Sequence, residues 1–166
     1  MHPITSKIET CLPGSVVLEK EAFGELTLTV SRKNLHAVLQ LLHDDPVLNF
    51  DHITDVTSVD FPNEEPRFAV IYQLYSIEKN HRVRVKARVP EDDCSVDSAT
   101  DIWQGANFLE REVYDMMGIT FNNHPDLRRI LMTEDYNEGY PLRKDFPVEG
   151  RGWRDSFEFF KESKAS

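Results

Sequence analysis

The alternation of apolar and polar residues predicts a strand-rich region in the first part of the chain. Leu26, Leu28 and Val30 alternate with threonines, as in a half-buried strand. Later runs are rich in β-branched and aromatic residues, and one of them is apolar on both faces, as a central strand would be. The expected strands span residues 26–30, 53–59, 68–75 and 83–89. Short polar loops separate the last three, which predicts an antiparallel meander.

Helical spacing predicts two helices around these strands. Ile4, Ile8 and Leu12 recur every four residues before Pro13-Gly14, and a brief strand is expected at 16–18. A second apolar stripe lies within residues 32–43, with Ser31 as the expected cap and Pro46 as the stop. The stripe consists of Leu35, Val38, Leu39 and Leu42. Packing of this helix against the meander predicts an α+β fold.

A third helix is expected directly before Gly118, which suits the left-handed residue that ends a helix. Asn107 is the expected N-cap and Glu110 its capping-box partner. Leu109, Val113 and Met116 or Met117 then share one face. Residues 91–99 form an acidic connector that leads toward this helix.

The stretch from residue 119 to 166, here called the arm, loses both helical and strand periodicity. A free loop of this length is unusual in a compact domain. Its apolar residues are interleaved with opposite charges, unlike the composition of a disordered tail. We therefore expect the arm to lie extended against a surface, with Glu112 and Asp115 pairing with arm arginines such as Arg128 and Arg129. The expected division is 1–97 (α+β domain), 98–118 (connector and helix) and 119–166 (docking arm and C-terminal tail).

Composition narrows the function classes. The chain has 166 residues and a net charge of -10, which disfavours nucleic acid or an anionic membrane surface as a direct partner. The apolar runs are too short for a membrane helix, and no signal-peptide core begins the chain, so a soluble, cytosolic-facing protein is expected. Cys11 and Cys94 lack ligand spacing for zinc or an iron–sulfur cluster. The glycines form no phosphate-binding loop, so neither NAD nor flavin binding is supported.

The helix and the start of the arm resemble a known signature. Glu110-Arg111-Glu112, Asp115-Met116-Met117, His124, Arg128 and Ile130-Leu131 occur in the order and spacing found in the C subunit of proton-pumping NADH:quinone oxidoreductase (respiratory complex I, NDH-1). Residues 138–146 continue the resemblance. Met117 stands where many relatives have Phe, and the chain lacks the fused D-subunit domain of some relatives, which implies a separate D subunit.

The resemblance implies a structural subunit of the peripheral arm of that complex, on the cytoplasmic side of the bacterial cell membrane. It implies neighbours in the quinone-site D subunit and in the B and I subunits. FMN and iron–sulfur clusters would lie in partner subunits, with none in this chain, and would pass electrons from NADH to quinone, coupled to proton translocation. No catalytic or metal-binding residue is expected. The expected interface or structural residues are Glu110, Arg111, Glu112, Asp115, His124, Asp126, Arg128, Arg129, Tyr140, Arg143, Lys144 and Asp145.

Two other functions stay open at this stage. Similar subunits occur in membrane-bound hydrogenases and ferredoxin-dependent complexes. A free-standing enzyme could use His124 with nearby carboxylates, although the spacing provides no nucleophile, base and orienting group, and His124-Pro125 is more typical of a turn.

Two surface features have competing interpretations. Arg82, Arg84, Lys86 and Arg88 share one strand face, which is either solvated beside acidic cross-strand partners or a docking site for an acidic partner. A short terminal helix with Trp153, Phe157 and Phe160 on one side would pack on the chain itself or on a neighbour.

Overall fold

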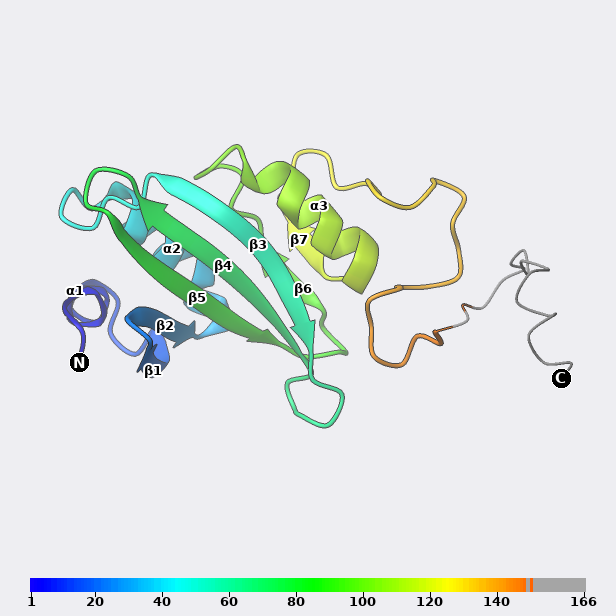
Figure 1. Cartoon of the computed structure of the whole chain (residues 1–166), viewed down its shortest axis with the longest axis horizontal. Coiled ribbons are helices and arrows are strands. Elements are labelled where there is room, and N and C mark those ends of the chain that lie inside the picture. Colours follow the sequence, from blue (N-terminus) through cyan, green and yellow to red (C-terminus); the bar gives the residue numbers. More distant parts are fainter. Residues whose placement is uncertain (149, 151–166) are drawn as a thin grey trace, which may run out of the picture.

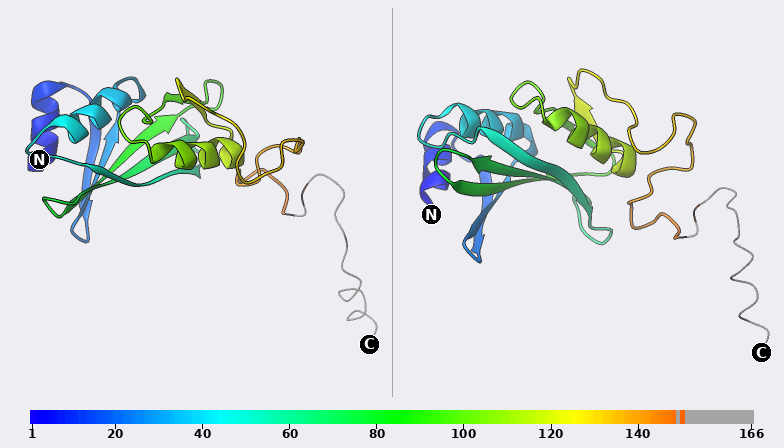
Figure 2. Two further views of the ribbon diagram at one scale, coloured as in Figure 1. Left: turned by 90° about the horizontal axis from the view of Figure 1, so that it is seen from above. Right: turned by 45° about the horizontal axis from the view of Figure 1, so that its top comes forward.

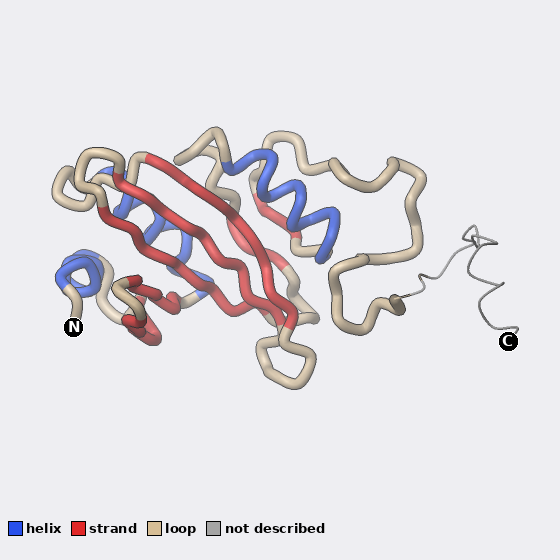
Figure 3. Tube along the Cα trace, in the orientation of Figure 1, coloured by secondary structure: helices blue, strands red, loops and turns tan. Residues whose placement is uncertain are grey.

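A five-stranded sheet forms the centre of the fold. The computed structural model describes residues 1–148 and 150, and its main sheet has the strand order β1-β2-β5-β4-β3 (Figures 1 and 3). The strands are β1 (Val16–Ala22), β2 (Glu25–Val30), β3 (His52–Asp60), β4 (Phe68–Ser76) and β5 (His81–Val89). Antiparallel pairing of β3, β4 and β5 confirms the expected meander. The parallel pairing of β2 with β5 was not expected from the sequence.

The helices cover one face of this sheet and leave the other face without a helix (Figure 2). They are α1 (Pro3–Cys11), α2 (Leu35–Asp44) and α3 (Ala106–Met117). Strand β4 shows the difference between the two faces, because Phe68, Tyr72 and Leu74 are buried whereas Ile71 and Gln73 are only half-buried. This arrangement confirms the α+β prediction.

The two N-terminal helices bury the stripes that the spacing predicts. Ile4 and Ile8 are buried in α1, and the stripe of α2 is fully buried. The predicted Ser31 cap is wrong, since Ser31 forms no side-chain cap hydrogen bond and a short 3₁₀ turn, η1 (Arg32–Asn34), precedes α2. Strand β1 also runs longer than the expected 16–18.

Two short strands correct the prediction of a non-periodic connector and arm. β6 (Ser95–Asp97) and β7 (Thr120–Asn122) pair in parallel as a second, two-stranded sheet. Val96 and Phe121 are buried at matching positions of the two strands. Three residues are too few to show a period of two, so the pairing of segments on either side of α3 was hidden from the sequence pattern.

The predicted capping box at the start of α3 is wrong. Gly105 occupies the N-cap position without a side-chain bond, and Asn107 already lies inside the helix. The side chain of Glu110 binds the connector instead, as described below. The other end is as expected, because Gly118 has the left-handed φ of 72°.

After β7 the described part of the arm, up to residue 148, runs around the C-terminal end of α3 on the side of the molecule away from α1 (Figure 1). It has no further helix or strand within the described residues up to 148. The helix predicted around Trp153, Phe157 and Phe160 lies outside the described residues. The division into three segments stays a prediction.

Candidate functional site

Helix α3 carries three buried charged side chains, and these organise the junction between the helix and the arm. Glu110 and Asp115 have no exposed surface, and Arg111 is 7% exposed. Buried charges are costly unless they are paired or hydrogen-bonded, so each must have partners nearby. The site can therefore be built from what these three side chains bind.

Arg111 and Asp115 form the first anchor of the arm. Arg111 donates from Nε to the carbonyl oxygen of Arg128 and from Nη2 to that of Arg129, each over 3.2 Å. Asp115 Oδ2 accepts the backbone N–H groups of residues 130, 131 and 132 over 2.8–3.0 Å. Because residues four apart share a helix face, one face of α3 binds both the carbonyl and the N–H groups of residues 128–132.

Asp115 also forms the ion pair that the charge pattern predicts. Its Oδ1 lies 2.6 Å from Nη1 of Arg129. Burial alone would raise the pKa of Asp115, but the three backbone N–H groups and the guanidinium of Arg129 outweigh burial and lower it. Asp115 is thus held as a carboxylate. Glu112 is exposed, and Arg128 pairs with Asp126 of the arm instead.

The second anchor joins the arm to the turn between β3 and β4. Arg67 and Asp60 form a bidentate pair with both distances 2.8 Å, and Asp60 has no exposed side-chain surface. Asp60 Oδ2 accepts the backbone N–H of Lys144 over 2.8 Å, and Arg67 lies 3.3 Å from Asp145. Hydrogen bonding to Arg67 lowers the pKa of Asp60, so the pair stays ionised. Glu91 completes the cluster at 2.7 Å from Arg67.

Between the anchors, the arm covers the C-terminal end of α3. Arg143 donates from Nε to the carbonyl oxygen of Met117 over 2.8 Å, and its guanidinium stacks over the rings of Phe68 and Tyr140 at 4.8 and 4.5 Å. A cation at the C-terminal end of a helix binds a carbonyl group that has no partner within the helix, and it interacts favourably with the negative end of the helix dipole. The Tyr140 ring lies so close to Gly118 that a Cβ there would come within 2.4 Å of it.

Glu110 and His124 form a separate buried pair beneath the start of the arm. Glu110 accepts from Ser98 Oγ over 2.6 Å and from the Ala99 N–H over 2.7 Å. Burial raises the pKa of Glu110 to about 7, although these two hydrogen bonds oppose the rise. The side chain of His124 is fully buried, with Nε2 4.0 Å from Glu110 Oε2.

The hydrogen bonds of His124 match a turn-forming role. Nδ1 accepts the N–H of Asp126 over 3.0 Å, and Nε2 lies 3.2 Å from the carbonyl oxygen of Asn107. The first bond requires an unprotonated Nδ1, so Nε2 carries the proton and donates to that carbonyl. The arrangement positions the arm and leaves neither imidazole nitrogen without a hydrogen-bond partner.

Several apolar side chains stay exposed around this junction. They lie on α3 and on the outer side of the arm. Their exposed fractions are 63% for Phe108, 60% for Leu131, 57% for Leu142 and 99% for Val148. Three of the four lie on the arm, which makes its outer side a candidate for contact with another chain.

Sequence reasoning identified the arm side of this site and missed the sheet side. Arg129, Arg143, Lys144 and Asp145 of the predicted set all contact the body. The sequence did not predict Asp60, Arg67 and Glu91, which bind the arm, or Ser98, which binds Glu110, because these residues lie in loops and strand ends with no periodicity of their own. The opposite charges of Asp60 and Arg67, seven residues apart on either side of a turn, were the available signal.

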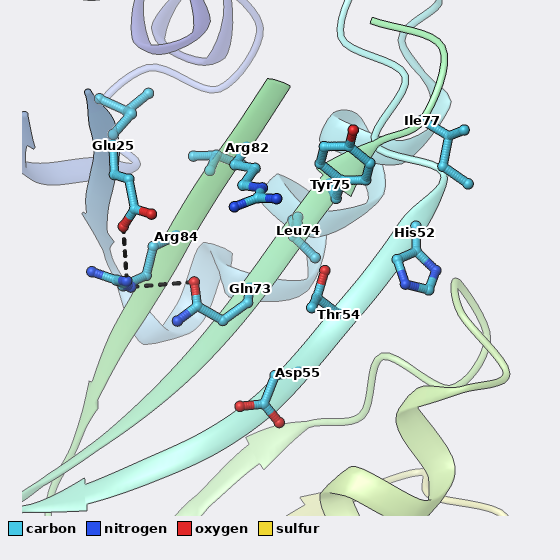
Figure 4. A pocket seen from close by; sticks show the side chains of 12 residues that line it. Glu25, His52, Thr54, Asp55, Gln73, Leu74, Tyr75, Ile77, Arg82 and Arg84 are labelled. Carbon is cyan, nitrogen blue, oxygen red and sulfur yellow. Dashed lines mark hydrogen bonds and ion pairs between the residues drawn. The ribbon is translucent and has the colours of Figure 1, made fainter. Parts of the chain in front are cut away.

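The described residues hold no metal centre. They contain no group of His, Cys, Asp and Glu side chains placed to hold a metal ion, and Cys11 and Cys94 are free thiols. No described helix is long and apolar enough to cross a membrane. A hollow of about 690 Å³ on the bare face of the sheet is lined by charged and polar side chains together with Leu26, Leu74, Ile77 and Val83 (Figure 4).

Comparison with known proteins places the chain in a family. Residues 28–152 match the family described as "Respiratory-chain NADH dehydrogenase, 30 Kd subunit". The chain belongs to this family. Relatives in it include the C subunit of NADH-quinone oxidoreductase from Geobacter metallireducens, 51% identical over 147 residues that cover 88% of this chain and 89% of the relative. The corresponding protein of Geobacter sulfurreducens is 49% identical, over 87% and 88% of the two chains.

Solved structures agree with the family assignment. A trypsin-resistant fragment (1–134) of Nqo5 superposes with a TM-score of 0.64 and 32% identity, covering 75% of this chain and 98% of the fragment. A chain of the membrane-bound sulfane sulfur reductase, an archaeal respiratory membrane complex, superposes with a TM-score of 0.74 over 97% of this chain and 89% of that chain. At 24% identity, the second comparison shows the shared fold alone.

Proposed function

We propose that the chain is the C subunit of a complex I-type NADH:quinone oxidoreductase and serves that enzyme as a scaffold without catalytic residues. Family membership and the names of relatives about half identical to it support the assignment. In this proposal FMN and iron–sulfur clusters in other subunits pass electrons from NADH to a quinone, coupled to proton translocation. The chain lies in the peripheral arm on the cytoplasmic side of the bacterial membrane, beside the D, B and I subunits.

The observation that carries the scaffold role is the way the arm is held. Buried side chains of α3 and the sheet bind its backbone at 128–132 and at 144, so its path is fixed before any partner binds. Its apolar side chains Leu131 and Leu142 nevertheless point outward. A preorganised apolar surface loses little conformational freedom on association, which favours tight docking.

The same geometry argues against an independent enzyme. His124 is the acid–base candidate of the sequence, and its side chain is fully buried, as is that of the neighbouring Glu110. The imidazole uses both nitrogens on backbone groups, so a substrate could reach it only if the turn opened. A general base must lie within hydrogen-bond reach of the proton it takes, which this arrangement does not allow.

The proposal is tested by placing a charge on the outer side of the arm. In Leu131→Glu a carboxylate would have to be buried at the docking surface, so we expect at least about tenfold less assembled complex on native gels. NADH:quinone activity per assembled complex should change less than about twofold. Val47→Glu is the matched control, because Val47 is 66% exposed in the loop between α2 and β3.

The opposite result would reject the scaffold role. Full assembly of Leu131→Glu with turnover reduced a hundredfold would show that the arm acts in the reaction. Equal loss of complex in Leu131→Glu and Val47→Glu would show that any added surface charge is harmful, and the arm would not be the docking element.

A further inference from the structure

The bare face of the main sheet carries a row of cations that the fold satisfies only in part. Arg82, Arg84, Lys86 and Arg88 all point to this face of β5. Arg84 pairs over 3.2 Å with Glu25 of the neighbouring strand β2, as the interpretation with cross-strand acidic partners predicts. Arg88 pairs over 2.9 Å with Glu64 of the loop between β3 and β4. These two cations are thus paired within the chain.

The other two cations have no carboxylate partner within ion-pair distance among the described residues. Arg82 is exposed, and its guanidinium lies 5.3 Å from the ring centre of Tyr75. The ammonium of Lys86 lies 4.7 Å from the ring centre of Phe61, and burial with the neighbouring Arg88 lowers its pKa. The net charge of the chain is -10, yet these two cations, which lack an ion-pair partner, make this uncovered face locally positive. A locally positive face favours contact with a negatively charged group.

The face is also hollowed beside Arg82. The hollow of about 690 Å³ has Tyr75 and Gln73 on its floor and Ile77 at its rim (Figure 4). Asp55 lines the other end, away from Arg82 in the same view. Ile77 is 65% exposed, so the hollow offers an apolar edge on the far side of Tyr75 from Arg82 (Figure 4).

The hairpin of β1 and β2 projects from the sheet (Figure 2), and Glu25 next to its tip lines the hollow. The tip carries an unusual residue. Phe23 has a φ of 56° and Gly24 a φ of 78°, both left-handed, and Phe23 is fully exposed. Two-residue hairpin turns of this kind favour Asn or Asp before Gly, since a bulky residue with positive φ is strained. A strained aromatic with no packing partner at the tip suits contact with another molecule.

From the unpaired cations, the hollow and the exposed aromatic tip, we propose that the bare face of the sheet is a second docking surface, which takes an acidic segment of another subunit of the complex. A carboxylate of the segment pairs with Arg82, and apolar side chains of the segment contact Ile77 and Phe23. The surface is formed by β1–β5 and contains no arm residue. Its existence therefore does not depend on docking through the arm.

The test places a photo-cross-linking aromatic, p-benzoylphenylalanine, at Tyr75 of the full chain within the membrane-bound complex. Irradiation should join this position to an acidic segment of another subunit. Arg82→Glu should lower the yield of this adduct at least about tenfold. Lys33→Glu is the matched control, since Lys33 is an exposed cation in the turn η1 and the change in net charge is the same. Should the Tyr75 substitution fold poorly, the cross-linker at exposed Ile77 reports on the same hollow.

Phe23→Asn supplies an independent reading. Asn tolerates positive φ, so the purified chain should melt about 2 to 4 °C higher while the adduct yield falls. A structural role alone predicts the first effect without the second. Unchanged adduct yield in Phe23→Asn or in Arg82→Glu would overturn the proposal.

Other occupants give distinct results. Adducts with lipid alone, or with a segment that lacks carboxylates, would also overturn it. The same cross-linker at Leu131 separates the two surfaces: adducts there but none at Tyr75 and Ile77 would reject this docking surface and leave the arm proposal intact. Adducts at Tyr75 and none at Leu131 would do the reverse.

Discussion

At the scale of single residues, the two buried carboxyl groups of α3 differ in the direction in which their pKa values are shifted. Asp115 receives three backbone N–H groups and Arg129, which keep its pKa low despite burial. Glu110 receives Ser98 Oγ and one N–H, which do not offset burial, and its pKa rises to about 7. Hydrogen-bond donors thus decide which carboxylate stays charged on the same helix.

The raised pKa of Glu110 predicts that the folded chain loses stability as the pH rises. Its folded-state pKa of about 7 lies above the ordinary value of 4.5, so folding takes up a proton between these values. The stabilisation is complete below pH 4.5 and is lost as the pH rises through 7. We expect the free energy of unfolding of wild type, relative to Glu110→Gln, to fall by about 3 kcal/mol from pH 4.5 to pH 8. Urea unfolding of both chains across this range measures it.

Glu112→Gln is the control for that experiment. Glu112 lies on the same helix but is exposed, so its variant should follow the pH dependence of the wild type. Identical pH dependence in wild type and Glu110→Gln would show that Glu110 ionises normally in the folded chain.

At the scale of elements, the C-terminal end of α3 combines a backbone requirement with a packing requirement. Gly118 has positive φ, and the Tyr140 ring occupies the place of a Cβ. Gly24 also has positive φ, but nothing lies within 4 Å of its Cβ position. Substitutions at the two glycines therefore separate the cost of backbone strain from the cost of steric overlap.

We expect Gly24→Ala to destabilise the chain by about 1 kcal/mol through left-handed strain alone. Gly118→Ala should cost about 2 kcal/mol more, since Tyr140 must leave its position. Thermal unfolding measures both changes, and faster proteolysis of the arm in Gly118→Ala alone would confirm that Tyr140 has moved. Equal destabilisation in the two variants would mean that Tyr140 moves aside without cost.

The sequence predicted the elements that are long enough to show a period. The stripe of α2 and the alternation of β5 each span several residues, so their type and buried face could be read. β6 and β7 are too short for this, and the parallel pairing of β2 with β5 is a long-range choice that local pattern does not encode. The predicted cap of α3 is wrong for another reason: Glu110 has the spacing of a capping box, but its side chain binds Ser98 and Ala99 of the connector instead.

At the scale of the whole molecule, the start of the arm belongs to the core. Ile119 has no exposed surface and Phe121 only 2%, and both lie directly after α3. From the sequence alone, a chain truncated after Gly118 is expected to stay folded, because the sequence does not show that Ile119 and Phe121 are buried. We now expect the chain ending at Gly118 to lose more than about 5 kcal/mol of stability, since two large core side chains and the partners of Asp115 are removed.

Urea unfolding and near-ultraviolet circular dichroism of the truncated chain test this expectation. A chain ending at Asn123 is the comparison, because it keeps both core side chains and β7. It should be more stable than the chain ending at Gly118. A cooperative transition at the wild-type midpoint for the shorter chain would show that the arm is an independent appendage.

The arm side of the candidate site was predictable, and its counterpart on the body was not. Charges without periodicity, such as those of Arg143 and Asp145, indicate that a segment must be held by side chains. They do not indicate which carboxylates or carbonyls bind them. Asp60 lies 84 residues before Lys144 in the chain, and only the folded sheet brings them together.

This separation has a consequence for biosynthesis. β2 can pair with β5 only after β5 has been made, and the N–H of Lys144 can bind Asp60 only when β3 and β4 are already joined by their turn. Contacts so distant in sequence form late, after the local hairpins. A partner that recognises the arm in its bound position would therefore bind fully folded chains and would not bind nascent or misfolded ones. The last contact to form would thus restrict assembly to correctly folded chains.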